Sequence, residues 1–176
     1  LRYPVAQNMF CSRAVTRGVE ACASAVYFPF SNIMPGGTYI YSIRLRLLTN
    51  LDGDEYVSPE QRGFVTCQLH SRHWIITNQD GTNEEVRGEG VVGYYPLLKP
   101  GCYENYYAND VNVVAGSRPV EVDIGTFAYQ SCTDVRSQIF AGFLTFVPGS
   151  LTNPEGEPFQ VRVAPFHLCS EPEYYY

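Results

Sequence analysis

The chain has 176 residues, a length that suits one domain with a full hydrophobic core and is too short for two ordinary ones. Hydrophobic residues make up 45% and charged residues 17%, a globular composition, and no apolar run approaches the roughly 20 residues needed to cross a bilayer. A formal net charge of −6 argues against nucleic acid as the main partner, because phosphate contacts need a basic face.

The two ends are predicted to be extensions of one central domain. The start, LRYPVAQNMF, has neither the basic nor the apolar region of a signal peptide, and it lacks an initiator Met. We therefore expect a processed or excised part of a larger protein. Residues 1–18 form the expected N-terminal extension, residues 19–168 the domain, and residues 169–176 the C-terminal extension.

Period-two alternation along 19–168 predicts strands rather than helices. In TYIYSIRLRLL (38–48), apolar side chains occupy one face, whereas Ser42, Arg44 and Arg46 occupy the other. NQDG (78–81) is a hairpin connection of the Asp-Gly type. Further strands are predicted at 19–28, 64–70, 73–78, 82–87, 102–108, 120–130, 138–147 and 159–168, with a loop at 148–158. Short strands separated by turn signals indicate an all-β, antiparallel β-sandwich.

The acidic residues and the cysteines indicate little specialised chemistry. Acids gather in predicted loops, and we interpret them as a solvated rim; they are Asp52, Asp54, Glu55, Glu60, Glu84 and Glu85. Six cysteines are present, but a domain of this size can bury enough apolar surface without disulfides. We therefore expect reduced thiols and an intracellular location.

The segment RGEGVVG (87–93) raises the question of a nucleotide site. Its glycines match G-x-G-x-x-G, and they are Gly88, Gly90 and Gly93. A dinucleotide fingerprint needs a helix beginning at the third glycine, and Pro96 and Pro100 forbid one there. We interpret the loop as a wide turn between strands. Arg87 with neighbouring N–H groups could instead hold an anion, which keeps a phosphate site as the alternative.

Two other groups of residues are functional candidates. Cys67, His70 and His73 stand three apart, yet positions 67 and 70 of a regular strand point to opposite faces, so a metal site is only a weak alternative to packing. Trp74 is expected to anchor the core. Neighbouring strand residues alternate faces, so one of Tyr94 and Tyr95 is expected to face outward in an aromatic rim.

The stretch SRHWIITNQDGTNEEVRGEGVVGYYPLLKPG (71–101) resembles the signature of the ApaG family. Arg72, His73 and Trp74 fit its Arg-(His/Tyr)-Trp strand, the segment 85–93 its glycine loop, and PLLKPG (96–101) its closing turn. The segments 38–50 and 159–168 resemble the family's second and last strands. The chain departs from the compact family in two insertions, near 49–63 and near 106–126.

Resemblance to the ApaG family implies an immunoglobulin/fibronectin-III-like sandwich. In eukaryotes such domains occur in F-box proteins and in a polymerase-delta-interacting protein, where they are regarded as protein-binding modules. Bacterial members have been linked to nucleotide polyphosphates and divalent cations. The resemblance thus favours a recognition module over an enzyme.

Our functional expectation is a non-catalytic protein-interaction module of ApaG type within a larger intracellular protein or assembly. No cofactor, membrane or nucleic acid partner is expected, and a cytoplasmic or nuclear location is favoured over a mitochondrial one. The alternatives are a nucleotide- or polyphosphate-binding protein, with or without hydrolase activity, and a purely architectural subunit. The predicted binding residues, for protein or phosphate, are Arg87, Gly88, Gly90, Gly93, Tyr94 and Tyr95.

Overall fold

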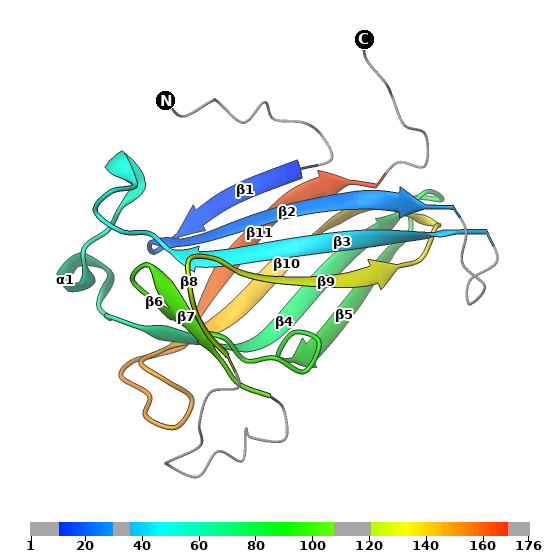
Figure 1. Cartoon of the computed structure of the whole chain (residues 1–176). Coiled ribbons are helices and arrows are strands. Elements are labelled where there is room, and N and C mark those ends of the chain that lie inside the picture. The colour runs from blue at the N-terminus through cyan, green and yellow to red at the C-terminus, as the bar shows by residue number, and fades with distance from the viewer. Residues whose placement is uncertain (1–10, 30–35, 108–120, 169–176) are drawn as a thin grey trace.

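Two antiparallel β-sheets pack face to face in the computed structural model, which describes residues 11–29, 36–107 and 121–168 (Figure 1). The first sheet has the order β1-β2-β3-β9, with bounds β1 Cys11–Thr16, β2 Val19–Phe28, β3 Thr38–Leu47 and β9 Phe127–Thr133. The second has the order β11-β10-β4-β6-β7-β8, and β5 also pairs with β4. Its bounds are β4 Cys67–Asn78, β5 Asn83–Glu89, β6 Leu97–Lys99, β7 Cys102–Asn105, β8 Glu121–Ile124, β10 Ser137–Pro148 and β11 Phe159–His167. The predicted all-β antiparallel sandwich is confirmed.

The two segments predicted at 64–70 and 73–78 are one strand, β4, with a β-bulge. Thr145 and Phe146 of β10 pair with Ser71 and Leu69, so His70 is an extra residue without a partner. The bulge reverses which side chains face inward: Leu69 is buried before it and Trp74 after it. A single period of two cannot describe such a strand.

The segment predicted as one strand at 120–130 is instead two strands in different sheets. β8 pairs with β7, whereas β9 pairs with β3. Gly125, at φ +111, lies between them. Part of the expected insertion near 106–126 therefore extends the second sheet, and the rest of that insertion, at 108–120, lies outside the described residues.

Strand β1 lies within residues 1–18, which the sequence assigns to an extension. It pairs with β2, and it also brings the two sheets together at one side of the sandwich (Figure 1). The Ser12 hydroxyl donates to the Ala164 carbonyl at 2.6 Å, and the Arg162 N–H donates to the Thr16 hydroxyl at 3.2 Å. The sandwich therefore begins earlier than predicted. The expected C-terminal extension, 169–176, lies outside the described residues.

Aromatic side chains from both sheets form the centre of the core. Trp74 is 2% exposed and packs against Phe140 at 4.9 Å and edge-on against Tyr41 at 6.2 Å between ring centroids. Since Tyr41 belongs to the first sheet and Trp74 and Phe140 to the second, these rings join the sheets. The prediction that Trp74 anchors the core is confirmed.

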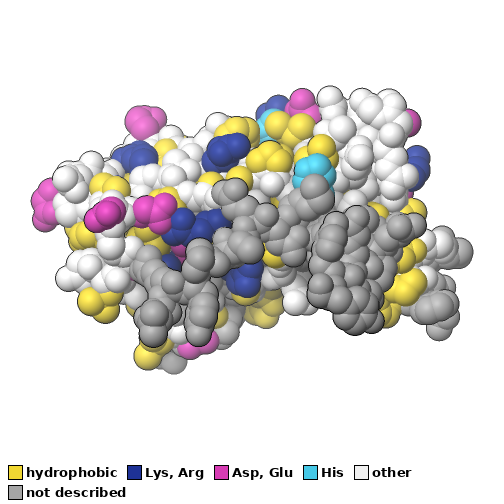
Figure 2. Space-filling view, turned by 90° about the horizontal axis from the view of Figure 1, so that it is seen from above, with side chains coloured by type: hydrophobic (Ala, Val, Ile, Leu, Met, Phe, Trp, Pro, Cys, Tyr) yellow, Lys and Arg dark blue, Asp and Glu magenta, His cyan; other side chains and the backbone are white. Residues whose placement is uncertain are grey.

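The surface mixes both signs of charge. In the view of Figure 2, toward the side of the two termini, acidic and basic side chains are interspersed with hydrophobic ones where described residues are visible. No helix among the described residues is long and apolar enough to cross a membrane. The helices are η1 Gly53–Glu55 and α1 Pro59–Arg62, both in the insertion at 49–63.

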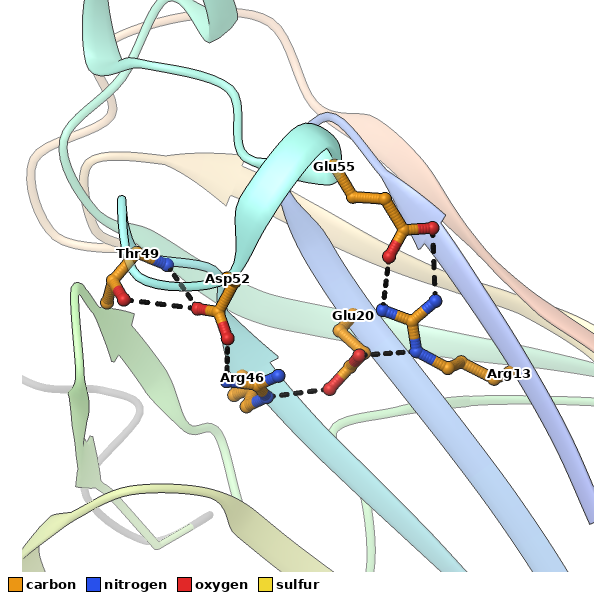
Figure 3. A network of polar contacts seen from close by, with 6 residues as sticks. All are labelled: Arg13, Glu20, Arg46, Thr49, Asp52 and Glu55. Carbon is orange, nitrogen blue, oxygen red and sulfur yellow. Dashed lines mark hydrogen bonds and ion pairs between the residues drawn. The ribbon is translucent and has the colours of Figure 1, made fainter. Parts of the chain in front are cut away.

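The acids of this insertion do more than form a solvated rim. Glu20 of β2 is 7% exposed and accepts from Arg13 Nε and Arg46 Nε, each at 2.6 Å. Asp52 continues the network by accepting from Arg46 at 2.9 Å. Figure 3 shows the complete set, Arg13, Glu20, Arg46, Thr49, Asp52 and Glu55. The network fastens the insertion to the outer face of the first sheet.

Candidate functional site

The predicted glycine loop is the end of β5 followed by a tight turn. Val91 N–H donates to the Tyr94 carbonyl at 2.9 Å, and Tyr94 N–H donates to the Val91 carbonyl at 2.8 Å. The two central residues, Val92 and Gly93, have φ +50 and +80, the signs of a type I′ turn. The prediction that the glycines shape a turn is therefore met at Gly93.

Position 90 requires a glycine because the backbone and side chains of the following residues approach it closely. Its φ is +59, and a Cβ there would stand 2.8 Å from the Tyr94 carbonyl oxygen and 2.9 Å from the Tyr95 ring. Its N–H donates to the His70 carbonyl at 2.8 Å, the last ladder bond between β5 and β4. Gly90 thus lets the chain fold back tightly over its own next residues.

No helix follows Gly93 within the described residues, and the chain continues extended into β6. The N–H groups of Gly90, Val91 and Tyr94 bond within or beside the turn, and that of Tyr95 donates to the Tyr106 carbonyl at 2.9 Å. A phosphate at the turn would compete with these four bonds for backbone donors.

The two tyrosines after the turn are less available than an aromatic rim requires. Tyr95 is 6% exposed, so it does not present its ring to a partner. Tyr94 is partly buried against the core; its ring lies 4.8 Å from that of Tyr107 and 6.3 Å, edge-on, from that of Phe127. Tyr107, at 44%, is the exposed member of this cluster.

Arg87 stands on β5 with most of its side chain exposed. Its Nη2 lies 3.0 Å from Glu85 Oε2, and His73 Nε2 lies 2.9 Å from the same oxygen. Arg87, followed by His73, holds the pKa of the Glu85 carboxyl below its usual range. Gly88, next to Arg87, lies under the Arg72 guanidinium, which donates to the Glu89 and Gly90 carbonyls at 3.0 and 2.8 Å.

A shallow hollow of about 330 Å³, which we call the sheet hollow, lies beside Arg87 on the outer face of the second sheet. It is lined by Ser71, Arg72, His73, Arg87, Gly88, Glu89, Thr145 and Gln160. Strand register explains the gathering, because Ser71 pairs with Glu89 on one side and with Thr145 on the other. Thr145 in turn pairs with Gln160 of β11, so four strands contribute to one row.

Three polar side chains of the sheet hollow have unused hydrogen-bonding capacity. The side chains of Ser71 and Thr145 are half-buried, that of Gln160 is exposed, and within the described residues none of the three has a hydrogen-bond partner. Polar side chains that are partly withdrawn from water gain from a ligand that offers hydrogen bonds. The hollow is therefore suited to a polar group brought by another molecule.

The weak metal candidates are not brought together. Cys67 is fully buried, His70 is exposed at the bulge, and His73 contacts Glu85. In the described part of the chain, no three His, Cys, Asp or Glu side chains group closely enough to hold a metal ion. The cysteines there are free thiols, namely Cys11, Cys22, Cys67, Cys102 and Cys132.

Ser71, Thr145 and Gln160 were not predicted as site residues. They come from three strands, and only the pairing of β4 with β10 and of β10 with β11 places them in one row. The available signal was the alternation of Phe143, Thr145 and Val147 in 138–147, which marks Thr145 as one member of a face but does not identify its neighbours.

Comparison with known proteins gives consistent relatives. A family model described as the ApaG domain matches residues 37–113. F-box protein SKIP16 of Arabidopsis thaliana is 35% identical over 167 residues, which cover 90% of this chain and 31% of that protein. Protein ApaG of Pseudomonas paraeruginosa is 54% identical over 55 residues, which cover 31% of this chain and 44% of that protein. The chain thus spans less than half the length of either relative.

Solved structures agree with the sequence relatives. A crystal structure described as an ApaA protein from Bordetella pertussis has a TM-score of 0.57 and 25% identity, and the match covers 88% of this chain and 94% of that one. A structural-genomics X-ray structure has a TM-score of 0.58 at 21% identity, covering 93% and 94%, and it supports the fold alone. Together, the sandwich, the turn after β5 and these matches show that this chain carries an ApaG domain.

Proposed function

We propose that this chain is a non-catalytic protein-recognition module of a larger intracellular protein, and that its partner docks over the sheet hollow. The single observation that carries the proposal is the convergence of Ser71, Thr145 and Gln160, which have no partners within the described residues, beside the charged rim of Arg87 and Glu89. A polar side chain of a partner protein would find donors and acceptors there on a rigid sheet.

The relatives support a modular role. The region that matches this chain makes up 31% of a protein named as an F-box protein, so in that relative the ApaG-like part is one segment among others. We extend this arrangement to the present chain. Arg87 then serves at the rim, while Tyr94 and Tyr95 support the turn behind it rather than contact the partner.

Substitutions that fill the sheet hollow test whether the partner binds there. Thr145→Arg places a long cation in the hollow, and Gln130→Arg places one on the exposed outer face of β9 in the other sheet. The partner is isolated by cross-linking from the native source, identified by mass spectrometry and titrated in purified form. We expect at least a tenfold loss of affinity for Thr145→Arg, unchanged affinity for Gln130→Arg, and similar thermal unfolding of both variants. Retained binding by Thr145→Arg would place the docking surface elsewhere.

Calorimetry separates this role from the nucleotide-binding alternative. ATP, GTP and dinucleoside polyphosphates, each with and without Mg²⁺, should give no binding heat. Micromolar binding that Arg87→Ala abolishes would favour the alternative. Arg87→Ala is the suitable probe because it changes an exposed side chain, whereas any side chain at Gly90 would collide with the Tyr94 carbonyl and disturb the turn.

A further inference from the structure

Strand β5 borders the second sheet with one edge that no described strand covers. It pairs with β4 alone (Figure 1). Six of its seven residues are exposed. An uncovered edge offers a row of backbone N–H and C=O groups to another strand. The residues of β5 whose backbone groups point away from β4 determine which strand this edge can pair with.

The hydrogen bonds at both ends of β5 identify the outward residues. Asn78 N–H donates to the Thr82 carbonyl, and Gly90 N–H donates to the His70 carbonyl, each at 2.8 Å. In an antiparallel pair alternate residues bond to the partner strand, so the even-numbered residues of β5 bond to β4. The outward set is therefore Asn83, Glu85, Arg87 and Glu89. Their side chains share the outer face with the sheet hollow, as the cross-strand pairs of Arg87 with His73 and Glu89 with Ser71 show.

This outward set is complementary to itself. When a second copy of β5 lies antiparallel with Val86 opposite Val86, Glu85 of each copy lies opposite Arg87 of the other. Asn83 lies opposite Glu89, an amide donor against a carboxylate that has no ion pair among the described residues. Directly opposed unlike charges favour strand pairing, whereas like charges oppose it.

Neighbouring registers are unfavourable. A slip of two residues in one direction places Arg87 opposite Arg87 and Glu85 opposite Glu89. A slip of two in the other direction places Glu85 opposite Glu85. Of these three registers, only the one centred on Val86 brings unlike charges together, so the charge pattern favours it over both neighbours.

The side chains on the inner face of β5 are also compatible with the register centred on Val86. Val86 is 40% exposed, and its contact with the second Val86 would cover part of this apolar surface. Glu84 of one copy would lie opposite Gly88 of the other, where the Arg72 guanidinium occupies the space above the glycine. This adds a second approach of unlike charges in each half of the interface.

We propose that two copies of this chain associate edge to edge through β5, in the antiparallel register that centres on Val86. The proposal does not rest on the recognition role, since self-association is measured without any partner protein, although Arg87 and Glu89 belong both to this edge and to the rim of the sheet hollow. The pairing is a two-fold symmetric contact that continues the sheet from one copy to the other. It would set the two sheet hollows on one continuous face, so that the pair could engage a partner at two points. The contact is small, so we expect weak and reversible association, with Kd on the order of 0.1–1 mM.

Charge reversal tests the register directly. Glu85→Arg places two cations opposite two cations, and Arg87→Glu leaves three anions on each outward edge, so either variant alone should associate at least tenfold more weakly. An equimolar mixture of the two should recover association, because each Arg then faces a Glu. Sedimentation velocity of the purified chain up to about 1 mM measures this without any partner protein. The matched control is Arg44→Glu, at an exposed arginine on β3 of the first sheet.

Cross-linking tests the centre of the register. Residue 86 of each copy would form a non-hydrogen-bonded pair, whose Cα atoms lie about 4.5 Å apart, within the range of a disulfide. In a chain carrying Cys132→Ser, Val86→Cys should form a covalent dimer on mild oxidation, whereas Val26→Cys, on the other sheet and more exposed, should not. Three results of the sedimentation experiment would each overturn the proposal. They are a wild-type chain that stays monomeric, single charge-reversal variants that associate like wild type, and a mixture of the two variants that fails to recover association. Loss of partner binding alone would bear on the recognition role instead.

Discussion

The guanidinium of Arg72 lies directly over Gly88: a Cβ on Gly88 would stand 2.8 Å from both terminal nitrogens of Arg72. The missing side chain lets Arg72 reach the carbonyls of Glu89 and Gly90. An exposed edge strand is thereby fixed to the body of the sheet at the point where it turns.

Replacing Gly88 with Ala should therefore displace Arg72 and weaken those two bonds. We expect the free energy of unfolding to fall by about 1–2 kcal/mol, as measured by urea denaturation. In an Arg72→Ala background the same Gly88→Ala change should cost much less, because the colliding group is absent. Equal losses in both backgrounds would show that the glycine serves another purpose.

Val92 occupies the left-handed region at φ +50, which is strained for a β-branched residue. Val92→Asn would give the turn an Asn-Gly pair, the preferred central residues of a type I′ turn. We expect a gain of about 1 kcal/mol in the free energy of unfolding. Val65, which is exposed to the same 55%, provides the control. Val65→Asn should bring no comparable gain, and an unchanged melting temperature for Val92→Asn would contradict the strain.

Acid should loosen the network that holds the insertion at 49–63. The Thr49 backbone N–H, together with Arg46 and the Thr49 hydroxyl, keeps the pKa of Asp52 below its ordinary 3.8. Because the pKa is lower in the folded state, the stabilisation is present above the unfolded pKa and is lost as pH falls through the folded pKa. We expect the unfolding free energy of Asp52→Asn to fall less than that of wild type between about pH 5 and 2. Glu157→Gln, at an exposed carboxylate, should follow wild type; identical curves for all three proteins would count against the network.

Thiol labelling should separate the cysteines by burial. Loss of hydration in the core raises the pKa of Cys67 to about 12, so almost no thiolate exists at neutral pH. Cys132 is exposed on β9. We expect a maleimide reagent at pH 7 to modify Cys132 within minutes and Cys67 only after unfolding, as read by peptide mass spectrometry. Rapid native labelling of Cys67 would mean that the sheets separate more readily than their packing indicates.

Much of the fold follows from local sequence, and its exceptions have local causes. The alternation around Tyr41 and Ile43 correctly predicts β3, because both faces of this strand keep one period throughout. The bulge at His70 breaks that period, so β4 was predicted as two strands. Strand β1 lies at an edge and is half-buried almost throughout, so it carries little alternation to detect.

The candidate site was predicted only in part. The exposure of Arg87 and the turn at Gly93 can be predicted from the sequence, because each depends mainly on the residue type at that position. The burial of Tyr95 could not be predicted, since the chain between the turn and β6 is not a regular strand and its faces do not alternate. The row through Ser71, Thr145 and Gln160 depends on long-range register, which no single segment encodes.

The family match at 37–113 begins at β3 and ends after β7, yet both strands that flank β3 and one that flanks β4 lie beyond these limits. The segment that the family model matches is therefore shorter than the unit that folds. A polypeptide trimmed to the signature would expose the apolar sides of Ile43 and Trp74 to water, and we expect it to aggregate rather than fold. The stretch that the family model matches thus depends for its folding on strands contributed from either end of the chain.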